Sequence, residues 1–400
     1  MGLIVQKFGG TSVATQDGLK AIVKHVSNCQ KEGNNVVVVV SAMGRKGDPY
    51  ATDTLIGLLE KIDPSIDPRK KDLIMSCGEI ISSAVVAHFL DLHNLASVPL
   101  TGFQARILTN DHPTNSDIID IDTQVIKKHL AMEKIVVIAG FQGITMDGII
   151  TTLGRGGSDT TAVELGAYLK ADRVDIFTDV PGVALTDPRI VGDAIYLSHI
   201  SYKNMYKLAS NGTKVIHPRA VAAAARANIP VRVRSTFQDD LGTLIFNEAM
   251  ENKRNIIGIS LDKGFSYLQL SNLNDFSYNN DIYPSLLTKM TEHYIGIYYK
   301  DNDFPSSLIQ QKDSIEKQYN EIDKISIFHE KEHTHFIQQK VLNYLQGKGL
   351  PLFDIFTFED HMSIMLSHEQ SITCIQYLYE YLKTIEQELS MEASKSCSIS

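Results

Sequence analysis

Apolar runs and amphipathic stretches alternate along the first 250 residues of the chain. Several runs are short and continuous, as expected for strands buried on both faces of a parallel sheet: Leu3–Phe8, Val36–Val40, Ile135–Ala139 and Arg173–Thr178. Between the first two of these, Asp17–Gln30 carries apolar residues at helical spacing. The order of strand, turn, helix and strand recurs as far as Asn247. This pattern predicts an α/β domain with a largely parallel sheet.

Further elements are expected at similar intervals in the same region. The expected helices are Thr52–Lys61, Asp72–Leu92, Thr123–Leu130, Thr160–Lys170, Tyr202–Ser210 and Arg219–Ala227. Ala96–Thr101 and Val231–Arg234 are expected as strands. Ile107–His112 leads through a polar turn, and Ile149–Leu153 feeds the glycine-rich loop that follows it.

The pattern changes after Glu251, where glycine becomes rarer and Tyr, Asn, Gln and His become more frequent. A first set of short elements comprises the strands Ile256–Leu261, Tyr267–Leu270 and Ile295–Tyr299 and the helix Pro284–Glu292. A second set comprises the strands Lys324–Phe328, Leu352–Phe358 and Met362–Leu366 and the helices Phe336–Gln346 and Ser371–Leu389. Two such sets predict paired small α+β modules, so we divide the chain into domains at residues 1–250 and 251–400.

The composition is that of an ordinary globular protein, with 43% hydrophobic and 21% charged residues. The formal net charge of -9 and the lack of a basic stripe argue against a nucleic-acid partner. Cys29, Cys77, Cys374 and Cys397 lie far apart without CxxC spacing, which favours reduced thiols over a disulfide framework or a zinc site. The N-terminus does not resemble a signal peptide, and the apolar runs are far shorter than a membrane span. We therefore expect a soluble cytoplasmic protein with no membrane partner.

The stretch Leu153–Ala167, LGRGGSDTTAVELGA, is a glycine-rich turn that opens directly into a helix. Glycines let backbone N–H groups approach a ligand, and a helix N-terminus carries partial positive charge, so the stretch is typical of an anion cradle. A tight turn capped by Ser158 or Asp159 is the alternative. Arg155 lies inside the turn, and its planar guanidinium suits a carboxylate. Asp159 could orient a substrate ammonium, act through a metal-bound phosphate, or only cap the helix.

Two further charged residues stand beside glycines. Lys7 lies at the carboxyl end of the first expected strand, next to Gly9 and Gly10, where open α/β sheets bind ligands. Its ammonium could meet a phosphate there. Glu79 follows Gly78 near the start of a long helix, where its carboxylate could bind a substrate ammonium. A solvated lysine and an acid that compensates the helix dipole are the respective alternatives.

A second polar cluster follows the strand expected at Arg173–Thr178. It could form an adenine and ribose pocket, and it comprises Thr178, Asp179, Gly182, Asp187 and Arg189. Turn chemistry alone also selects Asp, Pro and Gly at such positions. Lys214 follows another glycine and could reach a nucleotide phosphate or remain solvated.

Several familiar functional motifs are missing from the sequence. It has no GxxxxGK[ST] loop, no GxGxxG near the N-terminus, no HRD or DFG kinase motif and no GxSxG. His329, His333 and His335 cluster without zinc-type spacing and without a nearby cysteine. We interpret this cluster as a surface feature and predict no metal-ligating residues.

Eight sequence blocks resemble aspartate kinase and occur in the order of that family, over roughly residues 1–245. They are KFGGTSVA at Lys7–Ala14, VVVVVSAMG at Val36–Gly44, SCGE at Ser76–Glu79, GFQG at Gly140–Gly143, TTLGRGGSDTTA at Thr151–Ala162, FTDVPGV at Phe177–Val183, TDPR at Thr186–Arg189 and TKVIHPRA at Thr213–Ala220. The loop at Met43–Thr54 is similar to that of monofunctional bacterial kinases. The resemblance implies a three-layer αβα amino-acid kinase fold with a mainly parallel sheet. It also implies transfer of the γ-phosphoryl group of ATP to the side-chain carboxylate of L-aspartate. The product, 4-phospho-L-aspartate, leads towards lysine, threonine, methionine and diaminopimelate.

The same resemblance implies roles for the matching residues. Lys7 would stabilise the transferring phosphoryl group, and Asp159 would organise the centre. Glu79 would hold the substrate ammonium and Arg155 its α-carboxylate, with Ser41 and Thr52 near phosphate and substrate. The nucleotide would be bound by Lys7, Gly9, Gly10, Thr178, Asp179, Asp187, Arg189 and Lys214. Mg²⁺ would accompany ATP, because it prefers phosphate oxygens and water to a dedicated protein cage.

The family usually ends in tandem ACT modules, which bind inhibitory amino acids and build dimers. Here the polar stretches Ser271–Asn280 and His329–His335 stand where glycine-rich loops are common in that family. We therefore expect a divergent tandem ACT-like region, a homodimer, and weakened or altered feedback inhibition by lysine or threonine, because glycines permit close backbone approach to an amino acid. Two alternatives stay open: a kinase for another small amino acid or carboxylate, and a non-catalytic regulatory subunit. The second is disfavoured by the joint presence of Lys7, Glu79, Arg155 and Asp159.

Overall fold

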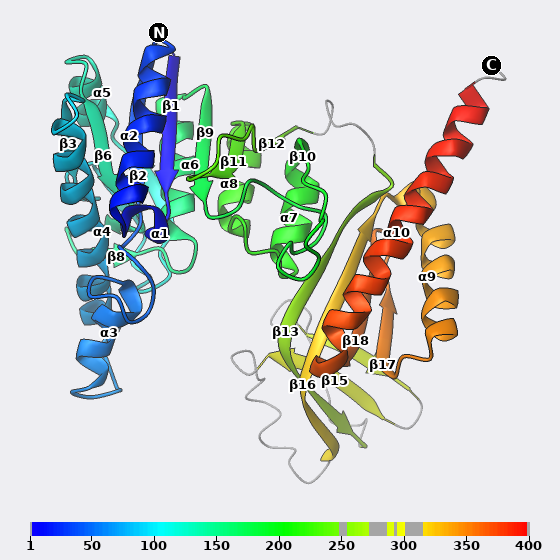
Figure 1. The fold of residues 1–400 in the computed structure, drawn as a ribbon. Helices are drawn as coiled ribbons and strands as arrows, with labels where there is room; N and C mark the ends of the chain where they lie inside the picture. The colour runs from blue at the N-terminus through cyan, green and yellow to red at the C-terminus, as the bar shows by residue number, and fades with distance from the viewer. Residues whose placement is uncertain (1, 248–253, 272–285, 292–293, 301–314, 398–400) are drawn as a thin grey trace. The chain divides into compact units, whose positions relative to one another are not determined.

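The computed structural model describes residues 2–247, 254–271, 286–291, 294–300 and 315–397. The chain forms two compact units (Figure 1). The first comprises Met1–Val183, Tyr196–Ser210 and Lys214–Asn252, and the second comprises Ala184–Ile195, Asn211–Thr213 and Lys253–Ser400. The second unit therefore includes two short segments from the N-terminal part of the sequence. The domain boundary expected at residue 250 stays a prediction, because it falls outside the described residues.

An eight-stranded sheet forms the centre of the first unit. Its strand order is β10 (His199–Ser201), β12 (Thr243–Phe246), β11 (Val231–Ser235), β9 (Arg173–Thr178), β1 (Gly2–Phe8), β2 (Asn34–Val40), β6 (Ile135–Ala139) and β3 (Ser97–Leu100). Neighbouring strands are parallel except β11 and β12. Lys7 of β1 is in register with Val39 of β2 and Ile176 of β9. It thus lies at the carboxyl edge of the sheet, where ligands bind in open α/β folds.

Helices cover both faces of this sheet (Figure 1). They are α1 (Gly10–Val13), α2 (Gln16–Lys31), α3 (Thr52–Glu60), α4 (Pro68–Asp91), α5 (Gln124–Leu130), α6 (Gly157–Leu169), α7 (Tyr202–Ser210) and α8 (Pro218–Ala227). Successive residues of β2 point to opposite faces. Val38 packs in one core with Ile22 of α2 and Val86 of α4. Val39 instead lies beside Gly140, next to Ser158 of α6. The predicted three-layer αβα arrangement with a mainly parallel sheet is therefore confirmed.

Helix α4 is the one described helix whose length and composition would allow it to cross a membrane. Half of its most apolar window, 50%, is buried inside the protein. It packs against β3, β6 and the short strand β8 (Ile150–Thr152), and it carries the buried carboxylates Asp72 and Glu79. These contacts are those of a core helix.

A small four-stranded sheet leads into the glycine-rich loop. Its order is β5 (Ile118–Ile121), β4 (Ile107–Thr109), β7 (Gln142–Ile144) and β8 (Ile150–Thr152). The hydroxyls of Thr109 and Thr151 meet at 2.5 Å in its interior. The sequence pattern did not predict this sheet as a unit, because strands of three or four residues carry too few positions to show a period.

The second unit contains a six-stranded sheet in which every neighbouring pair is antiparallel. Its order is β14 (Leu287–Met290), β15 (Ile295–Lys300), β13 (Ile256–Leu270), β16 (Ile315–His329), β18 (His361–Ser367) and β17 (Leu352–Thr357). Helix α9 (Thr334–Lys348) follows β16 through the short 3-10 helix η4 (Lys331–His333), and α10 (His368–Cys397) packs on β13, β16 and β18. The sheet with its helices agrees with the ACT-like α+β region that was expected.

Two expectations for this unit need correction. The strands expected at Ile256–Leu261 and Tyr267–Leu270 are one long strand, β13, which continues through a bulge between Asp262 and Phe265. The helix expected at Pro284–Glu292 is wrong in its described part, where Leu287–Met290 pairs with β15 as a strand. A run this short cannot be assigned to helix or strand from periodicity alone. Its ends, and most of the stretch Ser271–Asn280, lie outside the described residues.

Candidate active site

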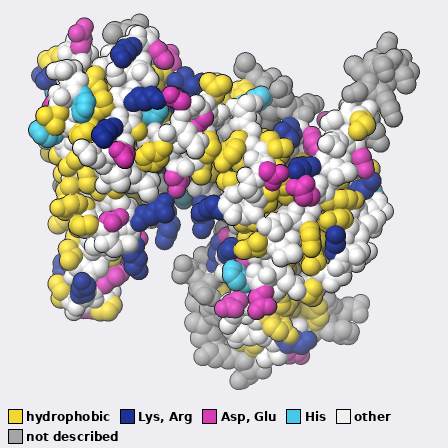
Figure 2. All heavy atoms as spheres, viewed as in Figure 1, with side chains coloured by type: hydrophobic (Ala, Val, Ile, Leu, Met, Phe, Trp, Pro, Cys, Tyr) yellow, Lys and Arg dark blue, Asp and Glu magenta, His cyan; other side chains and the backbone are white. Residues whose placement is uncertain are grey.

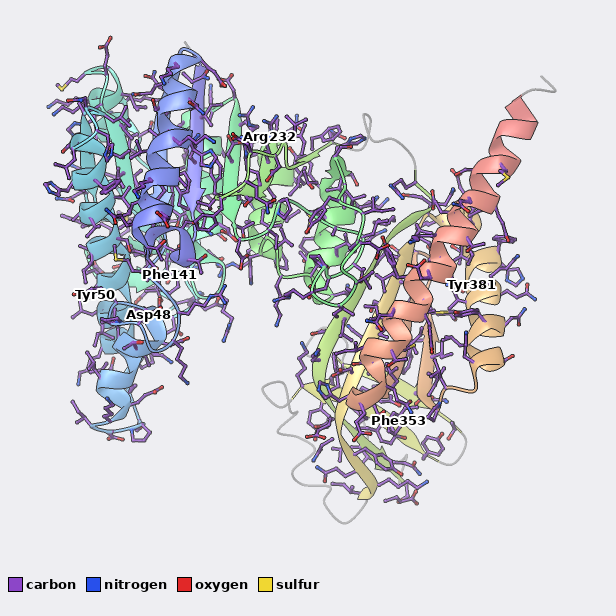
Figure 3. The ribbon with its side chains drawn as sticks, viewed as in Figure 1. Asp48, Tyr50, Phe141, Arg232, Phe353 and Tyr381 are labelled. Carbon is purple, nitrogen blue, oxygen red and sulfur yellow. The ribbon has the colours of Figure 1, made fainter. Side chains whose placement is uncertain are left out.

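A cavity of about 910 Å³ opens at the carboxyl edge of the large sheet. It lies among the ends of β1 and β2, the helices α3 and α4, and the glycine loop before α6. Its lining includes Lys7, Gly10, Ser41, Thr52, Glu79, Arg155 and Asp159, all of which were predicted site residues. Figure 3 shows Phe141, which also lines the cavity, and Asp48 and Tyr50 of the loop after β2 at the same end of the first unit. Segments that are far apart in the sequence thus converge on one pocket.

Lys7 and Asp159 form an ion pair across this cavity. Lys7 Nζ lies 2.6 Å from Asp159 Oδ1, and each side chain is 12% exposed. Helix α6 is capped by Gly156, with no side-chain cap, so the alternative in which Ser158 or Asp159 caps this helix is wrong. Asp159 instead stands in the first turn with its carboxylate at the lysine. The pair fixes the position of the Lys7 ammonium at the edge of the sheet.

Gly10 brings two loops together next to Lys7. A Cβ at Gly10 would lie 2.7 Å from the carbonyl oxygen of Ala42 and 2.8 Å from that of Gly44. The backbone N–H of Gly44 donates to the carbonyl of Gly10 at 3.1 Å. Gly9 precedes α1 with extended backbone, and a Cβ there would lie 3.7 Å from Lys7 Nζ. Only a residue without a side chain fits at Gly10, so this glycine lets the start of α1 pack directly against the loop after β2.

Glu79 is a buried carboxylate with one oxygen left unused. The residue is 3% exposed, and its Oε1 accepts a hydrogen bond from the backbone N–H of Ala42 at 3.0 Å. Its Oε2 has no hydrogen-bond partner among the described residues. Burial raises the pKa of Glu79 to about 8, against the smaller opposing effect of the Ala42 hydrogen bond. A buried, unpaired carboxylate at a cavity is suited to receive a cation.

Arg155 lines the same cavity from the glycine loop. Gly154 and Gly156 flank it with φ angles of 74° and 70°. A Cβ at Gly156 would lie 2.2 Å from the side chain of His217, so this position has no room for another residue. Arg155 is exposed, and within the described part of the chain it makes no ion pair. Its guanidinium is therefore available to a carboxylate.

The remaining predicted residues lie outside the cavity lining. Thr178 is the last residue of β9 and Asp179 follows it, and Thr178 Oγ1 donates to Asp179 Oδ1 at 3.2 Å. Asp187 and Arg189 belong to the second unit, where they pair with each other at 2.6 Å. This contact with Arg189 lowers the pKa of the Asp187 carboxyl. Lys214 is exposed in the first unit. A shared nucleotide site for these residues stays a prediction.

Two residues near the cavity, Asp72 and Arg219, were not among the predicted site residues. Asp72, buried in α4, accepts hydrogen bonds from Thr114 and Thr152. Arg219 of α8 donates to the carbonyl oxygen of Leu153 just before the glycine loop. The sequence shows only that Asp72 stands seven residues before Glu79 and hence on the same helix face, and it does not reveal the partners of Asp72.

The structure shows where the histidine cluster at His329–His335 lies. The described residues contain no group of three or more His, Cys, Asp or Glu side chains that could hold a metal ion. The interpretation of the cluster as a surface feature is wrong for His329, which is 0% exposed, whereas His335 is exposed. On the face drawn in Figure 2, acidic and basic side chains are scattered among apolar and polar ones.

The chain is similar to known proteins over most of its length. Residues 2–235 match the amino acid kinase family. The chain is 52% identical over 245 residues to aspartokinase 1 of Bacillus subtilis (strain 168), which covers 61% of this chain and 61% of that protein. It is 35% identical over 412 residues to the aspartokinase of Geobacillus stearothermophilus, which covers 98% of this chain and 100% of that protein.

A solved structure is similar in fold. E. coli aspartokinase III in complex with aspartate and ADP (R-state) matches with a TM-score of 0.74 at 23% identity, over 94% of this chain and 99% of that one. The alignment with the Bacillus subtilis protein spans about three fifths of its length, whereas the Geobacillus protein is covered completely. The chain belongs to the amino acid kinase family and, within it, to the aspartokinases.

Proposed function

We propose that the protein is an aspartate kinase, which transfers the γ-phosphoryl group of ATP to the side-chain carboxylate of L-aspartate and forms 4-phospho-L-aspartate. The observation that carries this proposal is Glu79, a carboxylate with 3% exposure whose Oε2 is unpaired at a cavity that Arg155 and Lys7 also line. The cavity lining also holds the carboxylates Asp53, Glu60 and Asp159 and the cations Lys46 and Lys71, and a lining with charges of both signs can receive the ammonium and the two carboxylates of aspartate. Similarity to an aspartokinase along its full length supports the same substrate.

Substrate recognition divides between α4 and the glycine loop. The substrate ammonium binds at Glu79 Oε2, and this pairing favours the ionised form of the Glu79 carboxyl. The α-carboxylate binds the guanidinium of Arg155, whose fork can form two parallel hydrogen bonds. The side-chain carboxylate is then left to point at the phosphoryl donor beside Lys7.

The transfer itself needs no general base. An aspartate carboxylate is already anionic, so one of its oxygens attacks the γ-phosphorus while the bond to the β,γ-bridging oxygen breaks and ADP leaves. Lys7 compensates negative charge on the phosphoryl oxygens, and Asp159 holds the lysine ammonium in place. Gly10 lets the start of α1 pack against the loop after β2, and Gly10 and Gly44 both line the cavity where the phosphate would bind.

The nucleotide would lie along the carboxyl edge of the sheet towards β9. Thr178 ends β9 and Asp179 follows it, and β9 is paired with β1, the strand that carries Lys7. Mg²⁺ would arrive with ATP and neutralise phosphate charge, and the described residues fit this role because they offer single carboxylates such as Asp159 rather than a closed cage. Roles for Asp187, Arg189 and Lys214 rest on the family resemblance.

A hydroxamate assay tests the proposed function directly. The purified protein is incubated with ATP, Mg²⁺ and hydroxylamine, which traps acyl phosphates, and with L-aspartate, L-glutamate or succinate in separate reactions. We expect hydroxamate with L-aspartate. Product from another substrate instead would indicate a kinase for a different small carboxylate. No product with any substrate would favour a regulatory subunit.

We further propose a cytoplasmic homodimer. Cys29, Cys77 and Cys374 are free thiols, as is usual in a reducing compartment where ATP is available. The six-stranded sheet of the second unit ends in β14 and β17, and open edge strands can pair with a second copy. Light scattering coupled to size-exclusion chromatography gives the mass: twice the chain mass is expected, and a single-chain mass would contradict the dimer.

A further inference from the structure

We infer that Asp72 is a positioning residue that fixes the glycine loop, and with it Arg155, against the helix that carries Glu79. The inference rests on the proposed function, because it concerns how the substrate amino acid is gripped. Asp72 does not line the cavity and is 0% exposed, so it cannot touch the substrate. Its effect must pass through the residues that it holds.

Asp72 and Glu79 lie seven residues apart in α4, which puts both carboxylates on one face of the helix, two turns from each other. Glu79 ends at the cavity, whereas Asp72 meets two separate segments. Both of its carboxylate oxygens accept the backbone N–H of Thr114 at 3.0 Å. Its Oδ1 also accepts the hydroxyl of Thr152 at 2.5 Å. These partners compensate an otherwise costly buried carboxylate.

The first partner, Thr114, packs against the glycine loop at Gly154. Its φ angle is 65°, a left-handed conformation that is uncommon for a β-branched residue and needs support from its surroundings. The backbone N–H of Thr114, which donates to both carboxylate oxygens of Asp72, gives that support. The carbonyl oxygen of Thr114 would lie 3.0 Å from a Cβ at Gly154, so the loop rests directly on it. Thr114 also lines the cavity together with Arg155.

The second partner, Thr152, ends the strand that runs into the loop. Its carbonyl accepts the N–H of Ser116 at 2.9 Å, which ties β8 to the segment that contains Thr114. Arg219 adds two hydrogen bonds between the same segments. It donates to the carbonyl of Leu153 and, at 3.0 Å, to Asn115 Oδ1. Asp72 is the one member of this network that belongs to α4.

The network therefore sets the spacing between the two groups that bind the amino acid. Glu79 is fixed by its helix, and Arg155 is fixed by a loop that Asp72 holds against the same helix. The ammonium and α-carboxylate of an amino acid lie on one carbon atom, so their two protein partners must keep a constant separation. If Asp72 loses its contacts, Arg155 moves relative to Glu79 and only the binding of the amino acid suffers.

Steady-state kinetics of Asp72→Asn test this inference. We expect the KM for L-aspartate to rise about tenfold or more, because small misplacement of a positioning group costs this much. The KM for ATP, and kcat at saturating L-aspartate, should change less than about threefold, since the loop is displaced and not removed. A matched pair of variants at Thr152 gives a second test that does not depend on the folding of D72N. Thr152→Val loses the hydroxyl that donates to Asp72 and should raise the KM for L-aspartate. Thr152→Ser keeps the hydroxyl and should have the wild-type KM.

Asp175→Asn is the control, because Asp175 is also a buried carboxylate of the first unit, paired with Arg173 at 2.6 Å on β9. It should lower the melting temperature without a selective rise in the KM for L-aspartate. The inference is overturned if D72N and T152V keep the wild-type KM for L-aspartate, or if both substrates lose affinity equally. A wild-type protein that forms no aspartyl hydroxamate would instead contradict the proposed function, so the two failures are distinguishable.

Discussion

The two units use buried charge in opposite ways. In the first unit, Glu79 keeps one carboxylate oxygen unpaired at a cavity, and Lys7 and Asp159 meet at its wall. In the second unit, Asp323 is 0% exposed and accepts from the N–H of Gly264 while it pairs with His368 at 2.9 Å. A buried charge costs little stability when it is paired and hydrogen-bonded within the fold, whereas an unpaired one lowers stability. Substitutions of the charged residues at the cavity should therefore affect binding and chemistry, whereas substitutions of buried polar groups in the second unit should affect folding.

The largest effect is expected for Lys7→Ala. The substitution removes the cation at the edge of the sheet and leaves Asp159 without its ion-pair partner. We expect kcat to fall by about 10²–10³ or more, the scale of one lost electrostatic contact to a transition state. The hydroxamate assay at saturating ATP and L-aspartate measures it. Lys20→Ala is the control, because Lys20 pairs with Asp17 at the exposed surface of α2 at 3.3 Å. Turnover near that of the wild type in K7A would remove the contrast between the units.

A smaller effect, on binding, is expected for Glu79→Gln. The amide can still accept from Ala42, but it offers no negative charge to the substrate ammonium. Hydrogen bonds to charged groups contribute about 1.5–3 kcal/mol, so the KM for L-aspartate should rise about tenfold to a hundredfold. Glu60→Gln is the matched control at the outer rim of the same cavity. An unchanged KM in E79Q would show that Glu79 does not bind the ammonium.

The raised pKa of Glu79 gives this prediction a pH signature. In the ligand-free protein, burial raises the pKa of the Glu79 carboxyl to about 8, so this carboxyl is mostly protonated at lower pH. A bound ammonium lowers that pKa, and binding therefore releases a proton below pH 8. The KM for L-aspartate of the wild type should fall as the pH rises towards 8 and then level off, whereas E79Q should lack this dependence.

The stability of the ligand-free protein should move in the other direction. A folded-state pKa above the unfolded value makes the ionised form unfavourable, so the folded state loses stability as the pH rises from the unfolded pKa towards 8. Glu79→Gln should therefore raise the melting temperature at pH 8 while it weakens binding. A lower melting temperature in E79Q would mean that the carboxylate serves the fold, as its counterparts in the second unit do.

The same contrast explains what the sequence could predict. Lys7, Glu79 and Arg155 stand beside glycines in short conspicuous blocks, so their roles could be predicted from local pattern and family resemblance. Asp72 could not, because its partners Thr114 and Thr152 lie 42 and 80 residues away. Long-range hydrogen bonds leave no periodic signal in a sequence.

The elements of the fold also differ in how far the sequence could predict them. The parallel sheet of the first unit was predictable because its strands are continuous apolar runs such as Val36–Val40, which is buried throughout. In the second unit, β14 was mistaken for part of a helix, since Leu287–Met290 has only four residues. The burial of His329 was missed because histidine is common on surfaces, and only its position at the end of β16 places it inside.

In the second unit, a loss of stability without loss of turnover is expected for Tyr298→Phe. The hydroxyl of Tyr298 donates to Asp354 Oδ2 at 2.5 Å, and the ring is 1% exposed. Removal of this hydrogen bond should lower the free energy of unfolding by roughly 1–2 kcal/mol, as measured by urea denaturation, while kcat stays within about twofold. Tyr267→Phe should cost less, because its hydroxyl reaches Gln269 Oε1 only at 3.4 Å. A large fall in kcat for Y298F with wild-type stability would contradict the division between the units.

The smallest effect is expected from added lysine and threonine. A glycine-rich effector loop would offer free backbone groups to an amino acid, but here the corresponding groups after β16 serve the fold. Glu330 N–H donates to the carbonyl of Asn255 at 3.0 Å, and His333 N–H donates to that of Glu330 at 3.3 Å. The Thr334 hydroxyl donates to the carbonyl of Lys331 at 2.9 Å. Allosteric effectors usually change affinity about 5–150-fold, whereas we expect millimolar lysine, threonine or both to change the initial rate at subsaturating L-aspartate by less than about twofold. Strong inhibition by either amino acid would show that this segment binds an effector in spite of its internal hydrogen bonds, and that the second unit, like the first, keeps groups available for a ligand.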